Sequence, residues 1–249
     1  MPGTGLVSSL SGAIKRVSRI NFLFRVGVFV MLVLCWGNSS RAQAQTQFGI
    51  DFTTVIPTGE FSRNVTNNGY GVGGNFLVGL GRSPVSVGVD AALATYGSEE
   101  HREPISTTIP ELRVKVRTNN NIVFTHAIVR VQTQNGRVRP YADGLIGFKY
   151  LFTDTAILND SNDEELASTK NLSDFAFSYG VGGGLQVNLG RFGRNGAVCL
   201  DGKVRYLAGG RAEYLKKGSI RRENGAVFFD VLNSRTDVVT VQVGVTFRF

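Results

Sequence analysis

Apolar and polar residues alternate along most of the chain beyond residue 44. In the last such run, residues 237–249, valine or phenylalanine occupies every second position from Val239 onward, and polar or small residues lie between them. Successive side chains of a β-strand point to opposite faces, so this run predicts a strand with one apolar and one polar face. Hydrocarbon cannot satisfy unpaired backbone groups, and strands therefore cross a bilayer only as a closed barrel.

Eight runs of this kind predict eight strands that are long enough to cross a bilayer at a tilt. They lie at residues 48–56, 70–81, 85–96, 122–132, 138–153, 174–189, 198–214 and 237–249. We therefore predict an all-β chain, in which residues 45–249 form one eight-stranded antiparallel transmembrane up-and-down β-barrel.

The connections between these runs alternate in length, which supports the same architecture. Three are short, and the one at residues 133–137 contains Asn135-Gly136, a strong hairpin signal. The other four, at residues 57–68, 97–121, 156–173 and 215–236, are long and polar, as expected of loops on the far side of a membrane. Two segments, 111–117 and 226–232, predict hairpin extensions above the membrane; as extra spanning strands they would make a barrel of ten.

The N-terminal segment predicts an export signal. Four basic residues precede the apolar run 26–36, and the small-residue site Ala42-Gln43-Ala44 follows it. The run is 11 residues long, well short of the ~20 that a spanning helix requires. We expect residues 1–44 to be a signal peptide cleaved after Ala44, which leaves Cys199 as the only cysteine of the mature chain.

The net charge of +8 would suggest a nucleic-acid partner if it belonged to the mature chain. Residues 1–44 hold five of the 27 basic residues and none of the 19 acidic residues, so the remainder carries 22 and 19, a net charge of +3. The basic residues are also scattered among the strands. We expect no nucleic-acid partner.

Alternation places many charged side chains on the inner face of the barrel. They are Asp51, Asp90, Arg130, Arg139, Asp143, Lys149, Asp201, Lys203, Arg205, Arg211, Glu213 and Arg248. A barrel of eight strands is just wide enough for side chains to fill it, and buried charges are costly unless paired. We expect a structural ion-pair network without an open pore; the alternative is a gated path for ions or protons along Asp143, Lys149, Asp201, Lys203 and Arg205.

Signals for catalysis are weak. His126 falls on an inward face and His101 in a charged loop, and neither has a catalytic partner at a fixed spacing. The glycine run 180–184 lacks the helix start and the lysine of a phosphate-binding loop. Two distant histidines and one cysteine make an unlikely metal site. We expect no enzyme, no cofactor and no metal; an enzyme that acts on lipid at the membrane rim is the less favoured alternative.

The last long connection contains an apolar group outside the predicted membrane band: Phe228, Phe229, Val231 and Leu232. These side chains would either extend a hairpin and cover the mouth of the barrel, which we favour, or form an adhesive or ligand-binding patch.

Taken together, the leader, the eight alternating segments and the final aromatic strand make residues 45–249 similar to the small outer-membrane β-barrel proteins of Gram-negative bacteria, such as the OmpA-type and OmpX-type barrels. The resemblance implies a bacterial outer membrane, contact with its lipid, and periplasmic short turns. It also implies that Val243, Val245, Phe247 and Phe249 carry the C-terminal signal that the barrel-assembly machinery reads.

Family members have diverse roles, so the resemblance implies location and architecture and no specific activity. No cell-wall-binding domain or plug domain is expected. We expect a structural or surface-interaction role, with an extracellular ligand at the loops as one candidate partner. A small gated channel and a carrier of a hydrophobic ligand are the alternatives.

Overall fold

The computed structural model describes residues 45–104, 113–159, 165–193, 196–216, 219–223 and 226–249. The expected signal peptide, residues 1–44, lies outside these, and so do its cleavage residues Ala42 and Ala44.

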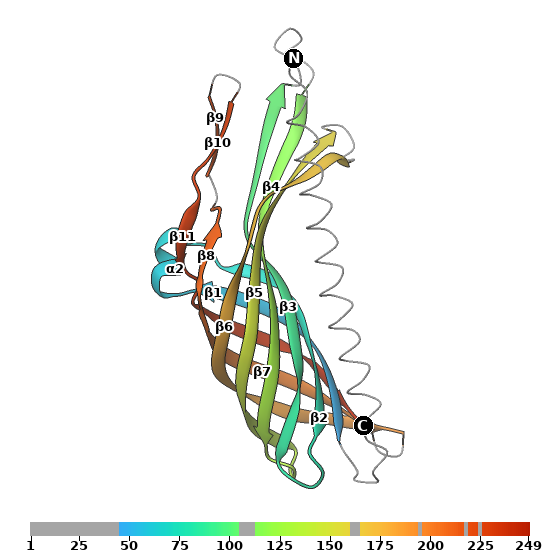
Figure 1. The fold of residues 1–249 in the computed structure, drawn as a ribbon. Coiled ribbons are helices and arrows are strands. Elements are labelled where there is room, and N and C mark those ends of the chain that lie inside the picture. Colours follow the sequence, from blue (N-terminus) through green and yellow to red (C-terminus); the bar gives the residue numbers. More distant parts are fainter. Residues whose placement is uncertain (1–44, 105–112, 160–164, 194–195, 217–218, 224–225) are drawn as a thin grey trace, which may run out of the picture. The chain divides into compact units, whose positions relative to one another are not determined.

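Eight strands form a closed antiparallel barrel, which confirms the predicted fold class (Figure 1). Their order around the ring is β1-β12-β7-β6-β5-β4-β3-β2. The bounds are β1 Thr46–Pro57, β2 Gly69–Gly79, β3 Val85–Pro104, β4 Arg113–Gln132, β5 Val138–Asn159, β6 Glu165–Phe192, β7 Gly196–Gly209 and β12 Val238–Arg248. Each of the eight predicted runs corresponds to one of them.

Strands β1 and β12 close the ring. Their register runs from Gln47 opposite Arg248 to Pro57 opposite Val238. Beyond β12, the backbone N–H of Phe249 donates to the carbonyl of Thr46 (2.9 Å). The first and last barrel strands thus meet along their full length, and the barrel has no free strand edge. The short connections lie at one end of the barrel, the turn end, and the long ones at the other, the loop end.

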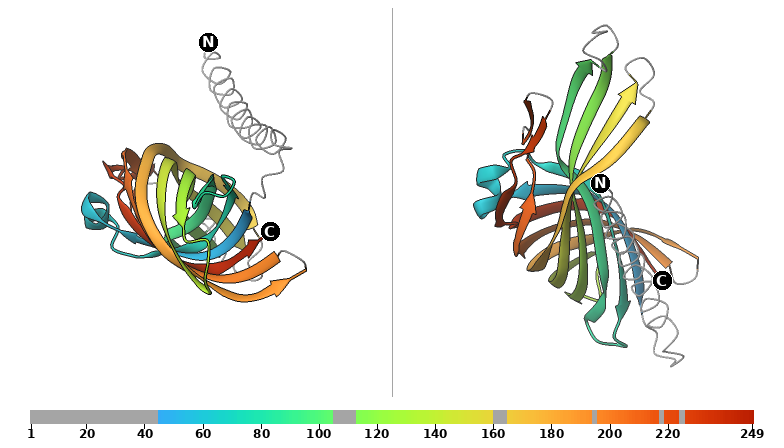
Figure 2. Two further views of the ribbon diagram at one scale, coloured as in Figure 1. Left: turned by 90° about the horizontal axis from the view of Figure 1, so that it is seen from below. Right: turned by 45° about the horizontal axis from the view of Figure 1, so that its top comes forward.

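Strands β3, β4, β5 and β6 continue beyond the loop end of the barrel (Figure 2). Pairing of β2 with β3 stops at Thr95, and pairing of β6 with β7 stops at Gly209. Pairing within β3-β4-β5-β6 continues for many residues past these points. We call this four-stranded part the outer sheet. Much of the predicted loops 97–121 and 156–173 is therefore strand, and the expected hairpin extension near residues 111–117 is confirmed from Arg113 onward.

The remaining long connections carry smaller elements. β8 (Arg211–Tyr214) pairs with β11 (Leu232–Arg235), and β9 (Ile220–Glu223) pairs with β10 (Ala226–Phe229). Residues 226–229 and 232 thus belong to short strand pairs outside the barrel and not to spanning strands, and the barrel has eight strands. The first long connection contains α2 (Gly59–Asn64), a short helix that the sequence pattern did not predict. No helix among the described residues is long and apolar enough to cross a bilayer.

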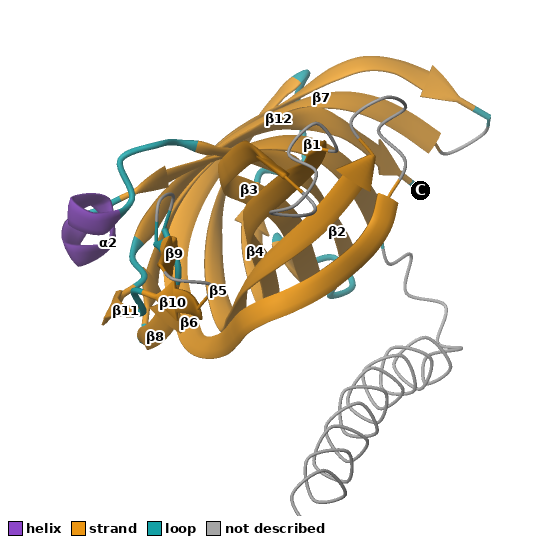
Figure 3. Cartoon of the chain, turned by 90° about the horizontal axis from the view of Figure 1, so that it is seen from above, coloured by secondary structure: helices purple, strands orange, loops and turns teal. Residues whose placement is uncertain are grey.

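The strands surround a central lumen (Figure 3). Large apolar side chains are exposed on the outside of the barrel, and most of its buried charged and polar side chains lie inside, the reverse of a water-soluble domain. Large apolar side chains point outward all around it; Val181 is 67% exposed and Phe175 is 59% exposed. Aromatic rings contact one another on the outer face of β5 and β6, where Tyr150 and Phe175 lie 4.5 Å apart between centroids. This outer face has the chemistry of a surface that contacts hydrocarbon.

The interior combines apolar and polar side chains, as the inward residues of β4 show. Ile122 and Phe124 lie toward the loop end and are buried among apolar side chains. Toward the turn end the buried polar residues His126, Arg130 and Gln132 follow, together with Ile128 of the same apolar cluster. The lumen is therefore filled by apolar side chains as well as by charged and polar groups.

Candidate functional site

The centre of the lumen is an ion-pair cluster around Asp143. Arg130 donates from Nε and Nη2 to the two oxygens of Asp143, at 2.7 and 2.9 Å. Arg205 donates to the same carboxylate at 2.8 Å, and its Nη1 donates to Asp90 at 2.8 Å. All four side chains are buried. Each arginine is paired, which offsets the cost of removing these charges from water.

The contact between Arg205 and Asp90 spans the full width of the barrel. Arg205 lies on β7 and Asp90 on β3, and these strands are four positions apart in either direction around the ring of eight. The cluster therefore links opposite walls.

A second cluster lies beside the first. Lys203 pairs with Asp51 at 2.6 Å, and Asn75 also donates to that carboxylate. Asp201 accepts hydrogen bonds from the hydroxyls of Tyr141 (2.5 Å) and Thr246 (3.0 Å). Neutral donors thus stabilise the aspartate that has no arginine or lysine within ion-pair distance among the described residues.

Closer to the turn end, three glutamines form a ring across the lumen. Gln47 donates to Gln132 (3.0 Å), Gln132 donates to Gln186 (2.7 Å), and Gln186 donates to Gln47 (3.3 Å). They come from β1, β4 and β6, so the ring joins well-separated walls. Side chains therefore bridge the lumen at the level of this ring as well as at the arginines.

Lys149 lies apart from the carboxylates. Its ammonium group donates to the backbone carbonyls of Leu207 (2.9 Å) and Thr236 (2.5 Å), and it forms no ion pair with any described residue. Both carbonyls lie where the pairing of β7 with β12 ends. Lys149 thus ties the loop-end part of β5 to these two strands, and it does not continue a chain of charges.

His126 has a partner that sequence spacing did not reveal. Its Nε2 lies 3.0 Å from the hydroxyl of Ser178, and that hydroxyl lies 3.1 Å from the carbonyl of Ala208. His126 and Ser178 are both buried. The pair therefore lies among the packed side chains of the lumen and not at the surface. The other histidine, His101, is exposed and lies 2.9 Å from Glu99.

The predicted placement in the lumen is wrong for two residues. Arg211 and Glu213 are exposed outside the barrel, whereas the alternate residues Ala212 and Tyr214 are buried. The cause is the break at Gly210: β7 ends at Gly209, and β8 starts with the opposite alternation. The prediction continued the alternation of β7 through Gly209 and Gly210, and it therefore assigned Arg211 and Glu213 to the wrong face.

The other predicted lumen residues differ in depth. Arg139 is only half-buried at the turn end, where its Nε donates to the carbonyl of Gly136. Arg248 is buried and donates to Gln45 at 2.6 Å. The remaining eight, Asp51, Asp90, Arg130, Asp143, Lys149, Asp201, Lys203 and Arg205, are buried within the barrel.

An aromatic clamp fixes α2 at the loop end. The ring of Phe61 packs edge-on against Tyr96 (5.6 Å between centroids) and Tyr214 (5.0 Å). Asn64 donates to the hydroxyl of Tyr214, and the hydroxyl of Tyr96 donates to the carbonyl of Leu215. The first and last long connections are thereby held together. A lone phenylalanine in the polar segment 57–68 was the available sequence signal.

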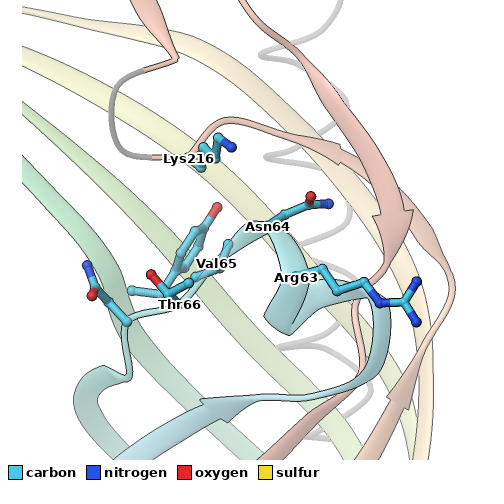
Figure 4. Close-up of a pocket in the computed structure, with 7 residues that line it drawn as sticks. Arg63, Asn64, Val65, Thr66 and Lys216 are labelled. Carbon is cyan, nitrogen blue, oxygen red and sulfur yellow. The ribbon is translucent and has the colours of Figure 1, made fainter.

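A pocket of about 350 Å³ lies beside this clamp (Figure 4). We call it the rim pocket. Its lining residues are Arg63, Asn64, Val65, Thr66, Asn67, Tyr96 and Lys216. Two cationic side chains that are far apart in the sequence, Arg63 and Lys216, line it. The sequence pattern did not predict it, because it depends on the docking of α2.

The expected apolar loop patch is only partly described. Val231 is exposed, and Leu232 packs against the buried apolar cluster. The side chains of Phe228 and Phe229 lie outside the described part.

The outer face of the last strand carries its apolar residues. Val243 and Phe249 are exposed, and Val245 and Phe247 are half-exposed. Phe192 packs edge-on against Phe247 (6.3 Å) and Phe249 (5.6 Å), which forms an aromatic group at the turn end. Within the described residues, no cluster of histidine, cysteine, aspartate or glutamate has metal-site geometry.

No protein-family model matches the sequence, and comparison with curated proteins finds no relative. Among solved structures, the chain is similar to Neisserial surface protein A (12% identity, TM-score 0.36), over 82% of this chain and 95% of that one. It is similar to Ail, the attachment invasion locus protein of Yersinia pestis (17%, TM-score 0.35), over 83% and 97%.

A third similar structure is a major outer membrane protein from Thermus thermophilus, at 10% identity and TM-score 0.41, over 82% of this chain and 99% of that one. These are low values, and the closed pairing of the chain's own eight strands is what establishes the barrel fold.

Proposed function

We propose that this protein is a bacterial outer-membrane β-barrel with a sealed lumen, exported through a cleaved signal peptide, that presents a binding surface outside the cell. The apolar outer face and the closed ring of strands support the membrane location. In that setting the turn end faces the periplasm and the loop end faces outward. The apolar face of β12, with Phe247 and Phe249, would be the segment read by the assembly machinery.

The observation that carries the sealed lumen is the bridge from Arg205 to Asp90 across the full width of the barrel. Together with the glutamine ring, it favours a structural network over the alternative of a path for ions. The refolded chain should therefore give no conductance steps in planar bilayers. Regular single-channel steps from a folded, heat-modifiable sample would overturn this part of the proposal.

The surface role rests on the outer sheet. Beyond Thr95, β3 remains paired with β4 as far as Pro104, but its pairing with β2 has ended. One edge of β3 there has no strand partner among the described residues. Such an edge can add a strand from an extended polypeptide through backbone hydrogen bonds.

A shortened variant tests this role. Glu99 and Thr118 are register partners, so residues 99–118 can be replaced by an Asn-Gly turn that joins β3 to β4 near the rim. Proteoliposomes with the full chain should retain unfolded, carboxymethylated lactalbumin but not the native protein, and the shortened variant should lose this retention. The matched control replaces residues 221–228 of the β9–β10 hairpin in the same way. Equal retention by both variants would exclude the β3 edge.

A further inference from the structure

The rim pocket combines positive charge with neutral hydrogen-bonding groups. Arg63 and Lys216 line it, and neither forms an ion pair with a described residue. The nearest acidic residue of α2, Glu60, accepts from the backbone N–H of Arg235 and lies 3.7 Å from Arg211. Glu60 is not part of the lining. The pocket is therefore cationic, without an acidic side chain among its lining residues.

The frame of the pocket is held in place before any ligand arrives. Phe61 is fully buried between Tyr96 and Tyr214, and Asn64 donates to the hydroxyl of Tyr214 at 2.9 Å. That hydroxyl is also within 2.7 Å of Ser234. These contacts fix the segment that carries Arg63, and the bond from Tyr96 to the carbonyl of Leu215 fixes the backbone next to Lys216. A site that is already ordered loses less entropy on binding.

The lining indicates the class of ligand. Two cations without acidic partners favour an oxyanion, because charge-assisted hydrogen bonds to phosphate or carboxylate are strong. Thr66 and Asn67 are exposed and offer hydroxyl and amide groups, which suit the hydroxyls of a sugar. Val65 and Tyr96 are the buried apolar residues of the lining. Lys216 lies across the pocket from Val65 and Thr66, and the side chain of Arg63 extends away from Lys216, so the two cations stand at opposite edges of the site (Figure 4).

We propose that the rim pocket binds a phosphorylated or carboxylated saccharide. Its volume falls within the usual range of small-molecule pockets, roughly 300–1,000 Å³. The proposal goes beyond the binding of polypeptide by the outer sheet, since the pocket and the free edge of β3 involve different residues. The same sugar-anion chemistry occurs in a free saccharide and in the headgroup of a phosphorylated glycolipid.

The test uses the full chain refolded in a non-ionic detergent, with glucose 6-phosphate and glucuronate as probes and glucose as the uncharged comparison. Titration followed by NMR or calorimetry should give saturable binding of the two anionic sugars. The double variant Arg63→Gln, Lys216→Gln should bind them about tenfold more weakly or worse. Binding of glucose as tight as that of glucose 6-phosphate would overturn the proposal.

The matched control is Arg82→Gln, Arg191→Gln, which removes two exposed cations at the turn end. It should bind the anionic sugars as the original chain does. If both double variants lose binding equally, the attraction is general and the pocket is not the site. Heat-dependent gel mobility and β-type circular dichroism establish that each variant is folded. Absence of saturable binding by the folded original chain would also overturn the proposal.

A nanodisc that contains a phosphorylated glycolipid distinguishes the two sources. If this lipid displaces bound glucose 6-phosphate, the pocket binds a membrane headgroup. If glucose 6-phosphate stays bound in the presence of the lipid, the pocket binds a free saccharide. The shortened variant without residues 99–118 keeps all the lining residues. It should still bind glucose 6-phosphate, so a failure of the polypeptide proposal and a failure of this one can be told apart.

Discussion

At the scale of single residues, Asp143 is the buried carboxylate that pairs with two arginines of the lumen. Its carboxylate neutralises Arg130 and Arg205 at once, and all three side chains are buried. Removing one partner of a buried ion pair is far more harmful than replacing the whole pair, because it leaves an uncompensated charge. Here a single substitution would leave Arg130 without its carboxylate and Arg205 with Asp90 alone.

Asp143→Ala should therefore lower the free energy of unfolding by about 3–5 kcal/mol. The matched control is Asp154→Ala on the same strand, where the carboxylate is half-exposed and outside the network. Urea titration of both variants in lipid vesicles measures the difference. A loss below about 1 kcal/mol for Asp143→Ala would mean that the arginines have other means of compensation.

The two faces of β12 give a second residue-scale prediction. Val243 is 54% exposed on the outer face, and Thr240 is buried inside. Val243→Arg should cost about 2–4 kcal/mol if the residue lies near the bilayer midplane, whereas Thr240→Ser should be mild. Unfolding in vesicles of defined thickness provides the measurement. Equal effects would contradict the assignment of the outer face to lipid.

At the scale of elements, α2 depends on tertiary contacts for its existence. It has only six residues, and Phe61 is its only buried side chain. Isolated helices of this length are unstable in water. The aromatic clamp therefore supplies the stability that the sequence of the segment does not.

Phe61→Ala should unfold α2 locally and leave the barrel intact. The amide of Val65, which donates to the carbonyl of Phe61 at 2.8 Å, should lose its protection from hydrogen exchange. Amides in the centre of β1 should keep theirs. Ser62→Ala on the same helix is the control and should leave the protection of Val65 nearly unchanged. Loss of protection throughout β1 would show that the helix is part of the global folding unit.

The elements also show what the sequence could and could not predict. Alternation identified all eight barrel strands, because an environment that is apolar outside and polar inside imposes a strict period of two. The outer sheet was only partly predicted, since segments in water on both faces, such as 97–104, have no such requirement. Arg211 and Glu213 were assigned to the wrong face because a glycine pair interrupts the period. The rim pocket required the docking of α2, which no local pattern encodes.

At the scale of the whole molecule, barrel closure depends on the contact between β1 and β12. Gly244 lies in this contact opposite Asp51. A Cβ atom at Gly244 would overlap the carbonyl oxygen of Ile50 and would lie 2.6 Å from the Cα of Asp51. Only glycine permits the two backbones to approach this closely.

Gly244→Ala should reduce the fraction of chains that refold to the closed, heat-modifiable form. Gly202→Ala on β7 is the control, because a Cβ there would meet nothing within 4 Å. Strand propensity alone would favour alanine at both positions, so only the steric contact separates them. Gel mobility before and after heating measures the fraction folded, and equal yields for the two variants would contradict the close approach.

The ion pairs of the lumen also differ in the stage of folding at which they can form. Arg130 and Asp143 are 13 residues apart and directly opposite each other on adjacent strands, so this pair can form within one hairpin. Arg205 and Asp90 are 115 residues apart, and Lys203 and Asp51 are 152 apart. These pairs require the ring to close. Loss of the local pair should slow folding, and loss of the distant pairs should mainly accelerate unfolding.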